Sequence, residues 1–314
     1  MNKNDGINFE MIKEIDGKLF SFKAQSVYEV QNTEKKDSND NHQKILDIGA
    51  KSPYLTRLIL QFEPMIKSSI VDETVQKQLI NHIWKMNKEL VACFASFKSL
   101  KQEVNTLALT CNDIMEQSKA KGNIPELPQA VDLENRVNTF FTMGNKFLIN
   151  TFKIFVILFN MTVAKNKEDS FKSHSRWIGN HFGTNHNIAQ IIEQDMQWIT
   201  LLSEASNAID KPIKKDKIEI KNFTLISGNK FIFPAWSYSL SHKKLGEVKN
   251  LNLLNDLDIF LDNMLCFFEE IMLQCIQEKL NENGNTLLYL EKIKEEEIDD
   301  NCPIQYAITY KVLN

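Results

Sequence analysis

A segment between Ser173 and His186 gathers residue types that could carry out acid–base chemistry on a phosphate. Arg176 stands five residues before His181 in this segment. A guanidinium holds phosphate oxygens with a planar fork of donors, and an imidazole exchanges a proton near neutral pH. The pair Arg176 and His181 is therefore a candidate for phosphodiester chemistry.

The same segment also has a purely structural interpretation. Gly179 and Gly183 predict a loop or a frayed helix, in which the spacing of Arg176 and His181 need not place both side chains on one face. Trp177 is a large apolar residue of the kind that packs against a core. The alternative to a site is a surface loop with incidental histidines and a packed Trp177.

No metal or cofactor is predicted. His174, His181 and His186 are not accompanied by a carboxylate at ligand spacing. The five cysteines form no CxxC pair, and an odd number without framework spacing favours a reducing compartment. Three of them lie in apolar helical runs and are expected to be small buried residues: Cys93, Cys266 and Cys275. The sequence also lacks glycine-rich phosphate loops and nucleophile motifs.

A second candidate lies at the end of the stretch from His186 to Pro212, which predicts one long helix stopped by proline. Asn207 and Lys211 lie near its end, and Lys214 and Lys215 begin a modest basic patch that follows. These four residues could bind RNA or an acidic partner. The alternative is an ordinary helix end, in which Lys211 complements the helix dipole and the following lysines are solvated.

The helix ending SNAIDKP resembles the Arg-Asn-x-x-x-His ending of HEPN (higher eukaryote and prokaryote nucleotide-binding) domains. The resemblance implies a helical bundle that often dimerises and that is, in many members, a metal-independent ribonuclease. Asn207 matches the asparagine of this pattern, whereas Ser206 stands at the arginine and Lys211 at the histidine. Serine cannot hold a phosphate as a guanidinium does, and lysine is a poor base at neutral pH. The resemblance therefore implies the fold with a non-catalytic role.

Arg176 and His181 have the Arg-x4-His spacing of HEPN nucleases. The order of features also resembles a group of uncharacterised bacterial proteins, in which such a helix precedes a β-hairpin, a helix and a similar tail. Three hypotheses follow. The chain is a non-catalytic HEPN-like bundle that acts by homodimerisation or by binding a partner or nucleic acid. It is instead a ribonuclease of a toxin or defence system that uses Arg176 and His181, or an interaction protein unrelated to nucleic acid.

The charge balance and the apolar segments limit the partners. The chain has 37 Lys and Arg residues against 41 Asp and Glu, so no overall basic field favours non-specific nucleic-acid binding. The segment from Phe147 to Val163 is short for a bilayer span and contains Lys153, which predicts a buried core helix. The polar N-terminus has no apolar signal region. We expect a cytoplasmic protein without membrane contact.

Helical patterns dominate the chain and predict a mainly α fold. Apolar residues at helical spacing predict one or two helices between Asp72 and Ser118, besides a helix after Ser52. Further long helices are predicted over 130–166, 186–212 and 250–281. Alternating apolar residues predict β-hairpins at 217–236 and 285–313 and one or two strands before residue 31. The expected architecture is a bundle of about five long helices with these hairpins as appendages.

Two domain-level expectations complete the prediction. Residues 1–43 are expected to form an extended segment and a mobile loop, and residues 44–314 a single bundle domain that includes both hairpins. The aromatic run from Phe231 to Tyr238 could stack bases, or it could seal the first hairpin onto the bundle. Pro234 in this run indicates an edge strand, because proline cannot donate to a β-ladder.

Overall fold

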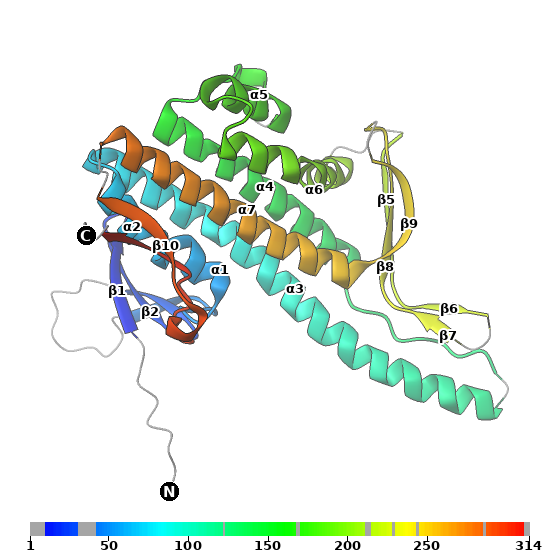
Figure 1. Cartoon of the computed structure of the whole chain (residues 1–314). Helices are drawn as coiled ribbons and strands as arrows, with labels where there is room; N and C mark the ends of the chain where they lie inside the picture. Colours follow the sequence, from blue (N-terminus) through cyan, green and yellow to red (C-terminus); the bar gives the residue numbers. More distant parts are fainter. Residues whose placement is uncertain are drawn as a thin grey trace, which may run out of the picture. The chain divides into compact units, whose positions relative to one another are not determined.

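The computed structural model describes residues 10–30, 42–121, 123–167, 170–210, 215–227, 230–242, 245–284 and 287–310. Most of them are helical (Figure 1). Four α-helices have more than twenty residues each: α3 (Glu73–Lys121), α4 (Leu133–Phe159), α6 (Asn187–Asp210) and α7 (Leu253–Glu282). The mainly helical class is confirmed. The count of five long helices is not, because α5 (Phe171–Phe182) has 12 residues.

The region before the long helices is helical but irregular. Three residues of α1 (Pro53–Leu55) lead directly into a π-helix over Thr56–Leu60 and then into α2 (Phe62–Ser69). The following pattern, expected to form one or two helices, forms the single helix α3. Its apolar stripe explains the continuity, since four residues at helical spacing are fully buried: Leu79, Ile83, Met86 and Leu90.

The chain divides into two compact units. Unit 1 comprises residues 1–91, 150–192 and 265–314, and unit 2 comprises residues 92–149 and 193–264. Each of the four long helices contributes residues to both units. The expected boundary between an N-terminal segment, residues 1–43, and a bundle domain, residues 44–314, stays a prediction. Strand β4 (His42–Leu46) includes residues from both sides of this boundary.

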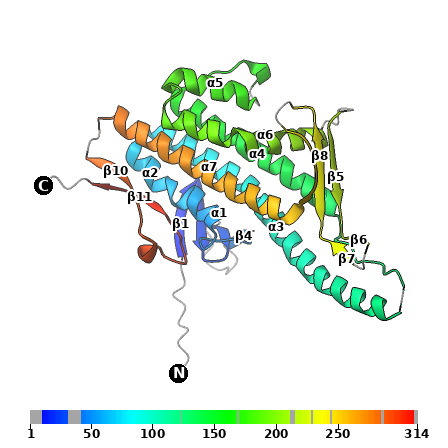
Figure 2. The same cartoon turned by 45° about the vertical axis from the view of Figure 1, so that its right-hand side comes forward.

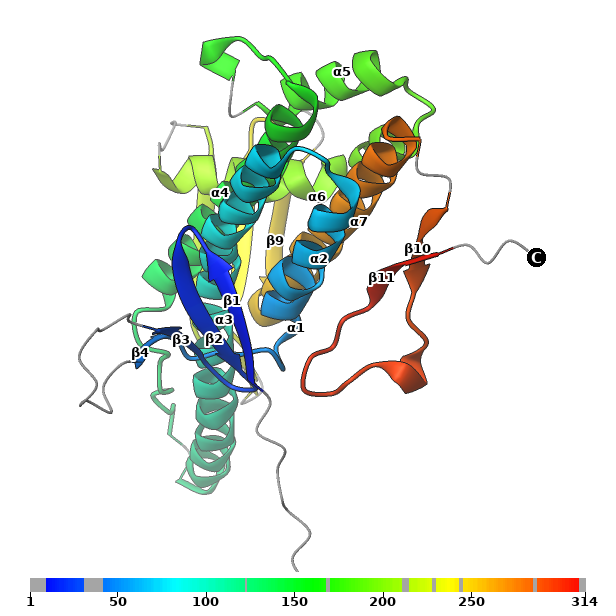
Figure 3. The ribbon, with the colours of Figure 1, turned by 90° about the vertical axis from the view of Figure 1, so that its left-hand side faces the viewer.

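Unit 1 contains an antiparallel sheet in the order β1-β2-β3-β4, seen in Figure 3. Its first three strands are β1 (Glu10–Ile15), β2 (Lys18–Lys23) and β3 (Val27–Val30), one more than expected before residue 31. Phe20 and Phe22 of β2 pack on Trp84 of α3, with ring centroids 4.9 and 5.9 Å apart. The expected mobile loop falls largely on residues 31–41, which lie outside the described residues, while its last residues begin β4.

The expected C-terminal hairpin is present in unit 1. Strand β10 (Leu288–Lys292) pairs antiparallel with β11 (Tyr306–Tyr310), and the acidic residues Glu295–Glu297 form an exposed 3-10 turn between them. A buried polar network ties this hairpin to the helices. Gln61 donates to the Glu269 carboxylate at 2.7 Å and accepts from the backbone N–H of Gln305 at 2.7 Å. Arg57 pairs with the same carboxylate.

Unit 2 contains the expected hairpin and one strand that was not expected. Strand β5 (Lys217–Lys221) pairs with β8 (Ala235–Leu240), and β6 (Thr224–Ile226) pairs with β7 (Lys230–Ile232). The unexpected strand is β9 (Gly246–Asn252), which pairs with the other side of β8. The three-stranded order is therefore β5-β8-β9, and Figure 1 labels the three strands.

The run around Pro234 forms two strands: β7, which is an edge strand because its sheet has two strands, and β8, which begins after Pro234 and is the central strand of its sheet. Pro234 lies just before the first residue of β8, a position where no ladder hydrogen bond from its nitrogen is required. Its carbonyl accepts from the backbone N–H of Leu253, the first residue of α7, at 3.2 Å. The proline therefore belongs to the junction between sheet and helix.

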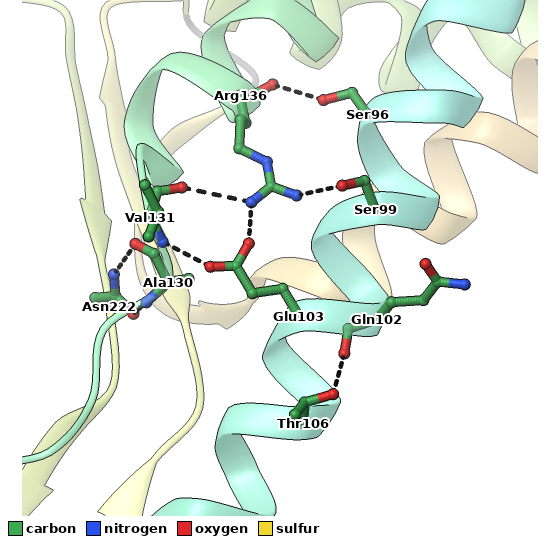
Figure 4. A network of polar contacts seen from close by, with 9 residues as sticks. All are labelled: Ser96, Ser99, Gln102, Glu103, Thr106, Ala130, Val131, Arg136 and Asn222. Atoms are coloured by element: carbon green, nitrogen blue, oxygen red, sulfur yellow. Dashed lines mark hydrogen bonds and ion pairs between the residues drawn. The ribbon is translucent and has the colours of Figure 1, made fainter.

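A polar network in unit 2 fixes the segment that leads into α4 (Figure 4). Glu103 of α3 accepts from the backbone N–H of Val131 at 2.8 Å and pairs with Arg136. Asn222, between β5 and β6, accepts from the N–H of Ala130 at 3.0 Å and donates to its carbonyl at 2.9 Å. This reciprocal pair imitates a β-bridge and joins the hairpin to the helices of the same unit.

Two residue-level expectations have clear outcomes. Cys93 and Cys275 are buried, as predicted, but Cys266 is exposed. The apolar run around Cys266 did not reveal that its position faces away from the core. Within the described residues, α4 has the length and apolar composition for a membrane span, and half of its most apolar window is buried inside the fold.

Candidate binding site

Arg176 and His181 lie on one helix, on different faces of it. The segment that carries them is the regular helix α5 rather than a loop, capped by Ser170 and ended at Gly183, whose φ is +97°. Residues five apart on an α-helix point about 140° away from each other. The exposed ring of His181 stacks on Trp177, with centroids 4.5 Å apart and planes 13° apart. His181 therefore belongs to an aromatic surface, and Arg176 is a separate exposed cation.

The other two histidines of this segment have structural surroundings. His174 is buried and stacks on Phe152 at 5.1 Å. His186 lies at the start of α6, where its Nδ1 accepts from the backbone N–H of Ile188 and its Nε2 lies 3.3 Å from Glu278. In the part of the chain that the structure describes, no three His, Cys, Asp or Glu side chains are grouped as a metal site.

The family-like helix end adjoins a more promising surface. Helix α6 runs to Asp210, with Ser206 buried at 1% exposure and Asn207 exposed. Ser206, at the position of the family arginine, thus cannot present a group to a ligand. Lys211 and Lys214 lie outside the described residues, whereas Lys215 is exposed.

A hollow of about 680 Å³ lies in unit 2 beside this helix end, and we call it the sheet hollow. It is lined by Ala208 of α6, by β5 with the preceding Asp216, by Ser237–Ser239 of β8 and by Glu247, Lys249 and Asn250 of β9. Figure 2 shows β5 and β8 beside α6. The candidate residues Asn207 and Lys215 each directly precede a lining residue in the chain, namely Ala208 and Asp216.

Strand alternation builds the polar lining. Ile218 and Ile220 of β5 are half-buried, so Lys217, Glu219 and Lys221 are exposed on the opposite face. In the register, Lys217 faces Ser239 and Glu219 faces Ser237 on β8. The small serines of the central strand leave space between the longer side chains of the two outer strands, which accounts for the hollow.

Some charged side chains of the sheet hollow are already paired with each other, and others are not. Lys221 pairs with Glu219 at 3.3 Å, and Lys249 pairs with Glu247 at 2.8 Å. Hydrogen bonds from Ser241, including its backbone N–H at 2.7 Å, lower the pKa of Asp216 and keep it ionised. Lys217 has no ion pair among the described residues. Lys217 and the neighbouring Lys215 are therefore the cations available to a ligand.

A second hollow of about 450 Å³ lies in unit 2 between α6 and strands β8 and β9, and we call it the amide–aromatic hollow. Seven residues line it: Gln194, Gln197, Trp198, Leu201, Tyr238, Leu245 and Val248. Tyr238 lines both hollows. The sequence pointed to the aromatic run that contains Tyr238 but not to the lining residues of α6. A helical stripe of this composition usually packs into a protein core, so the pattern did not indicate a site.

Trp236 of that aromatic run seals the hairpin onto the helices, as the alternative interpretation expected, whereas Phe233 is exposed. Trp236 is 1% exposed and packs on Phe141 of α4 at 5.2 Å. Its indole N–H donates to Asp256 of α7 at 2.7 Å. Trp236 is therefore a structural residue, and Tyr238 is the member of the run that reaches a hollow.

Comparisons of the chain with protein-family models, with curated proteins and with solved structures give no match. The resemblance to HEPN domains therefore stays a prediction from the helix ending. The chemistry of the two hollows is what indicates a function.

Proposed function

We propose that the chain is a non-catalytic, HEPN-like helical protein that acts by binding, and that the sheet hollow binds single-stranded nucleic acid. The observation that carries this proposal is the hollow itself. It is lined by Lys217, which has no ion pair among the described residues, and the exposed Lys215 directly precedes its lining residue Asp216. Serine hydroxyls and lysine ammonium groups are the side chains that contact phosphate and sugar oxygens in such complexes.

The charge inventory favours a small number of phosphate contacts. Two lysines of the sheet hollow are already paired with glutamates of their own strands. Lys215 and Lys217 then provide two contacts, which suits a short stretch of backbone rather than a long polyanion. For single strands, each neutralised phosphate contributes about −0.7 to the slope of log affinity against log salt, so we expect a slope near −1.4.

The non-catalytic assignment has a geometric basis. General acid–base catalysis requires the reacting groups to lie within contact range of the same phosphate. Arg176 and His181 diverge on α5, and the ring of His181 is stacked on Trp177. The competing hypothesis of a ribonuclease that uses Arg176 and His181 is therefore less favoured than binding.

Binding to labelled single-stranded RNA of about ten nucleotides, followed by fluorescence anisotropy, tests the proposal. Lys215→Glu combined with Lys217→Glu should weaken binding about tenfold or more and abolish most of the salt dependence. Lys77→Glu makes a single charge reversal of the same kind at an exposed position of α3 in unit 1 and should leave affinity within about twofold.

The same samples separate binding from catalysis. The RNA should remain intact after prolonged incubation with the wild-type protein. Cleavage that is lost in Arg176→Ala would establish the ribonuclease hypothesis instead. Wild-type binding that is equally strong in the Lys215→Glu/Lys217→Glu variant would show that the sheet hollow is not the binding surface.

Self-association is a second candidate function, favoured by the apolar surface of the β6–β7 hairpin in unit 2. Ile226, Ile232 and Phe233 are 39, 40 and 43% exposed. This sheet has two strands, and both of its outer edges lack a partner strand among the described residues. Open edges and apolar side chains together are features of surfaces that pair with another chain.

A further inference from the structure

We infer that the amide–aromatic hollow is a binding site for a nucleobase, either as a free nucleotide or as one base of a strand. The inference about a strand rests on the proposed function, whereas binding of a free nucleotide does not. The hollow combines two aromatic residues, Trp198 and Tyr238, with two side-chain amides, Gln194 and Gln197. Its volume of about 450 Å³ lies within the usual range for small-molecule sites.

The helical wall is a regular stripe. Gln194, Gln197, Trp198 and Leu201 follow one another at spacings of three, one and three residues, so they lie on one face of α6. The opposite wall comes from Tyr238 of β8, Val248 of β9 and Leu245 between these strands. The ligand space is therefore bounded by regular elements on both sides, which keeps its width fixed.

The aromatic residues are held in place before any ligand arrives. The indole N–H of Trp198 donates to Asp195 at 2.8 Å, one turn earlier on α6. Burial raises the pKa of Asp195, although this hydrogen bond opposes the change. Tyr238 is 8% exposed, and its ring lies 5.3 Å from that of Trp236. Fixed aromatic faces bind planar ligands at a low entropic cost.

The polar groups of this hollow select the ligand class. None of the seven lining residues is charged, so the hollow suits an uncharged planar group rather than a phosphate or a carboxylate. Each glutamine amide offers one acceptor and two donor hydrogens, which is what the edge of a nucleobase needs. Gln194 and Gln197 are exposed, and neither side chain is hydrogen-bonded within the described part of the chain.

Tyr238 lines both hollows, but strand alternation separates the rest of their linings. Tyr238 pairs with Ile218 in the register, whereas Lys217 pairs with Ser239, so Lys217 belongs to the opposite face of the sheet. The amide–aromatic hollow is therefore a site separate from Lys217, and the two sites are tested by separate variants.

Titration of the full-length protein with adenosine monophosphate, followed by tryptophan fluorescence, tests the inference. We expect saturable quenching by the nucleotide and none by ribose 5-phosphate, which has the sugar and phosphate without a base. Trp198→Phe should remove the quenching, because its indole would be the reporter in contact with the base. Trp177→Phe, a matched change on α5 in unit 1, should preserve the quenching.

Gln197→Leu tests the amide without altering the aromatic reporter. It should weaken nucleotide binding about five- to tenfold, the cost of leaving base-edge groups without a partner. A second arm replaces the nucleotide with a short single-stranded oligonucleotide. Quenching by both ligands would indicate a base site that serves a strand, and quenching by the nucleotide alone would indicate a free-nucleotide site.

The outcomes separate the two proposals. Oligonucleotide binding that depends on Lys217 but leaves Trp198 fluorescence and Gln197→Leu affinity unchanged would overturn the base site and retain the proposed function. Nucleotide quenching without any oligonucleotide binding would support the base site and overturn strand binding. The absence of both signals would overturn both.

Discussion

The side chains of Arg57 and Glu269 form an ion pair inside unit 1, with 13 and 5% of their side-chain surfaces exposed. Burial opposes the charge of Arg57, but the hydrogen bonds and the attraction of Glu269 raise the pKa of its guanidinium above the ordinary value. Gln61 extends the pair to the backbone of the C-terminal hairpin. A buried ion pair contributes little net free energy to stability. Removing one partner is strongly destabilising, because the other charge then remains buried without a partner.

Arg57→Met should therefore destabilise the protein by about 3–5 kcal/mol, because Glu269 would remain buried without its main partner. Urea denaturation measures this change. The double variant Arg57→Met/Glu269→Met should recover a large part of the loss, since it removes both charges and keeps the volume. A single variant that costs less than about 1 kcal/mol would mean that water reaches Glu269 in the folded protein.

At the scale of elements, Glu63 links β1 to α2 in unit 1. Its carboxylate contacts Lys13 of β1 at 2.5 Å and Lys67 of α2 at 2.6 Å. Burial raises the pKa of Glu63, but the hydrogen bonds and charges of the two lysines lower it by more. The net result is a pKa below the ordinary value of 4.5. A carboxyl whose pKa is lowered on folding stabilises the fold above that ordinary value.

The contribution of Glu63 should be lost as the pH falls through its lowered folded-state pKa. Glu63→Gln should cost about 1.5–3 kcal/mol at neutral pH, the range for hydrogen bonds to a charged group. It should also reduce the loss of stability on acidification, measured by thermal unfolding from neutral pH to about pH 3. Glu73→Gln, at an exposed position of α3, should leave the pH profile unchanged.

The sequence predicts a helix or strand well when a local pattern of residues is sufficient to specify it. Helices α3, α4, α6 and α7 follow long apolar stripes, which one stretch of chain is sufficient to specify. Strand β9, GEVKNLN, has few apolar residues and is a strand because β8 lies beside it. The segment around Arg176 looked irregular because of its glycines, yet Gly179 is accommodated inside α5.

The candidate site was only partly predictable for the same reason. The sequence pointed to the end of α6 and to the aromatic run that includes Tyr238, and both adjoin the hollows. Gln194, Gln197 and Trp198 line a hollow only because β8 and β9 lie opposite them, and that is set by tertiary structure. The Arg176 and His181 spacing had chemical meaning only if both side chains shared a face, and α5 separates them.

At the scale of the whole molecule, the open β6–β7 hairpin predicts an oligomer. Ile226→Glu combined with Ile232→Glu should shift the protein to the mass of one chain, whereas the wild type should sediment as a dimer. Charges at an apolar contact lose their hydration without gaining partners, which opposes association. Val71→Glu, at an 80% exposed residue in unit 1, is the matched control and should remain dimeric.

Sedimentation of the wild-type protein as a single chain across the accessible concentrations would contradict this prediction. A dimer that survives both hairpin substitutions would place the contact elsewhere in the molecule. Either result leaves the nucleic-acid proposal standing, since the sheet hollow does not include the substituted residues.

Unit 1 is built from three separate stretches of the chain, and this affects how the protein folds during its synthesis. Unit 1 is assembled from residues 1–91, 150–192 and 265–314, and unit 2 from the two stretches between them. Glu269 and Gln305, which complete the network of Arg57, are synthesised more than 200 residues after it. The buried network of Arg57 therefore cannot close before these later residues have left the ribosome. A nascent chain released early would expose an unfinished core to proteases and chaperones.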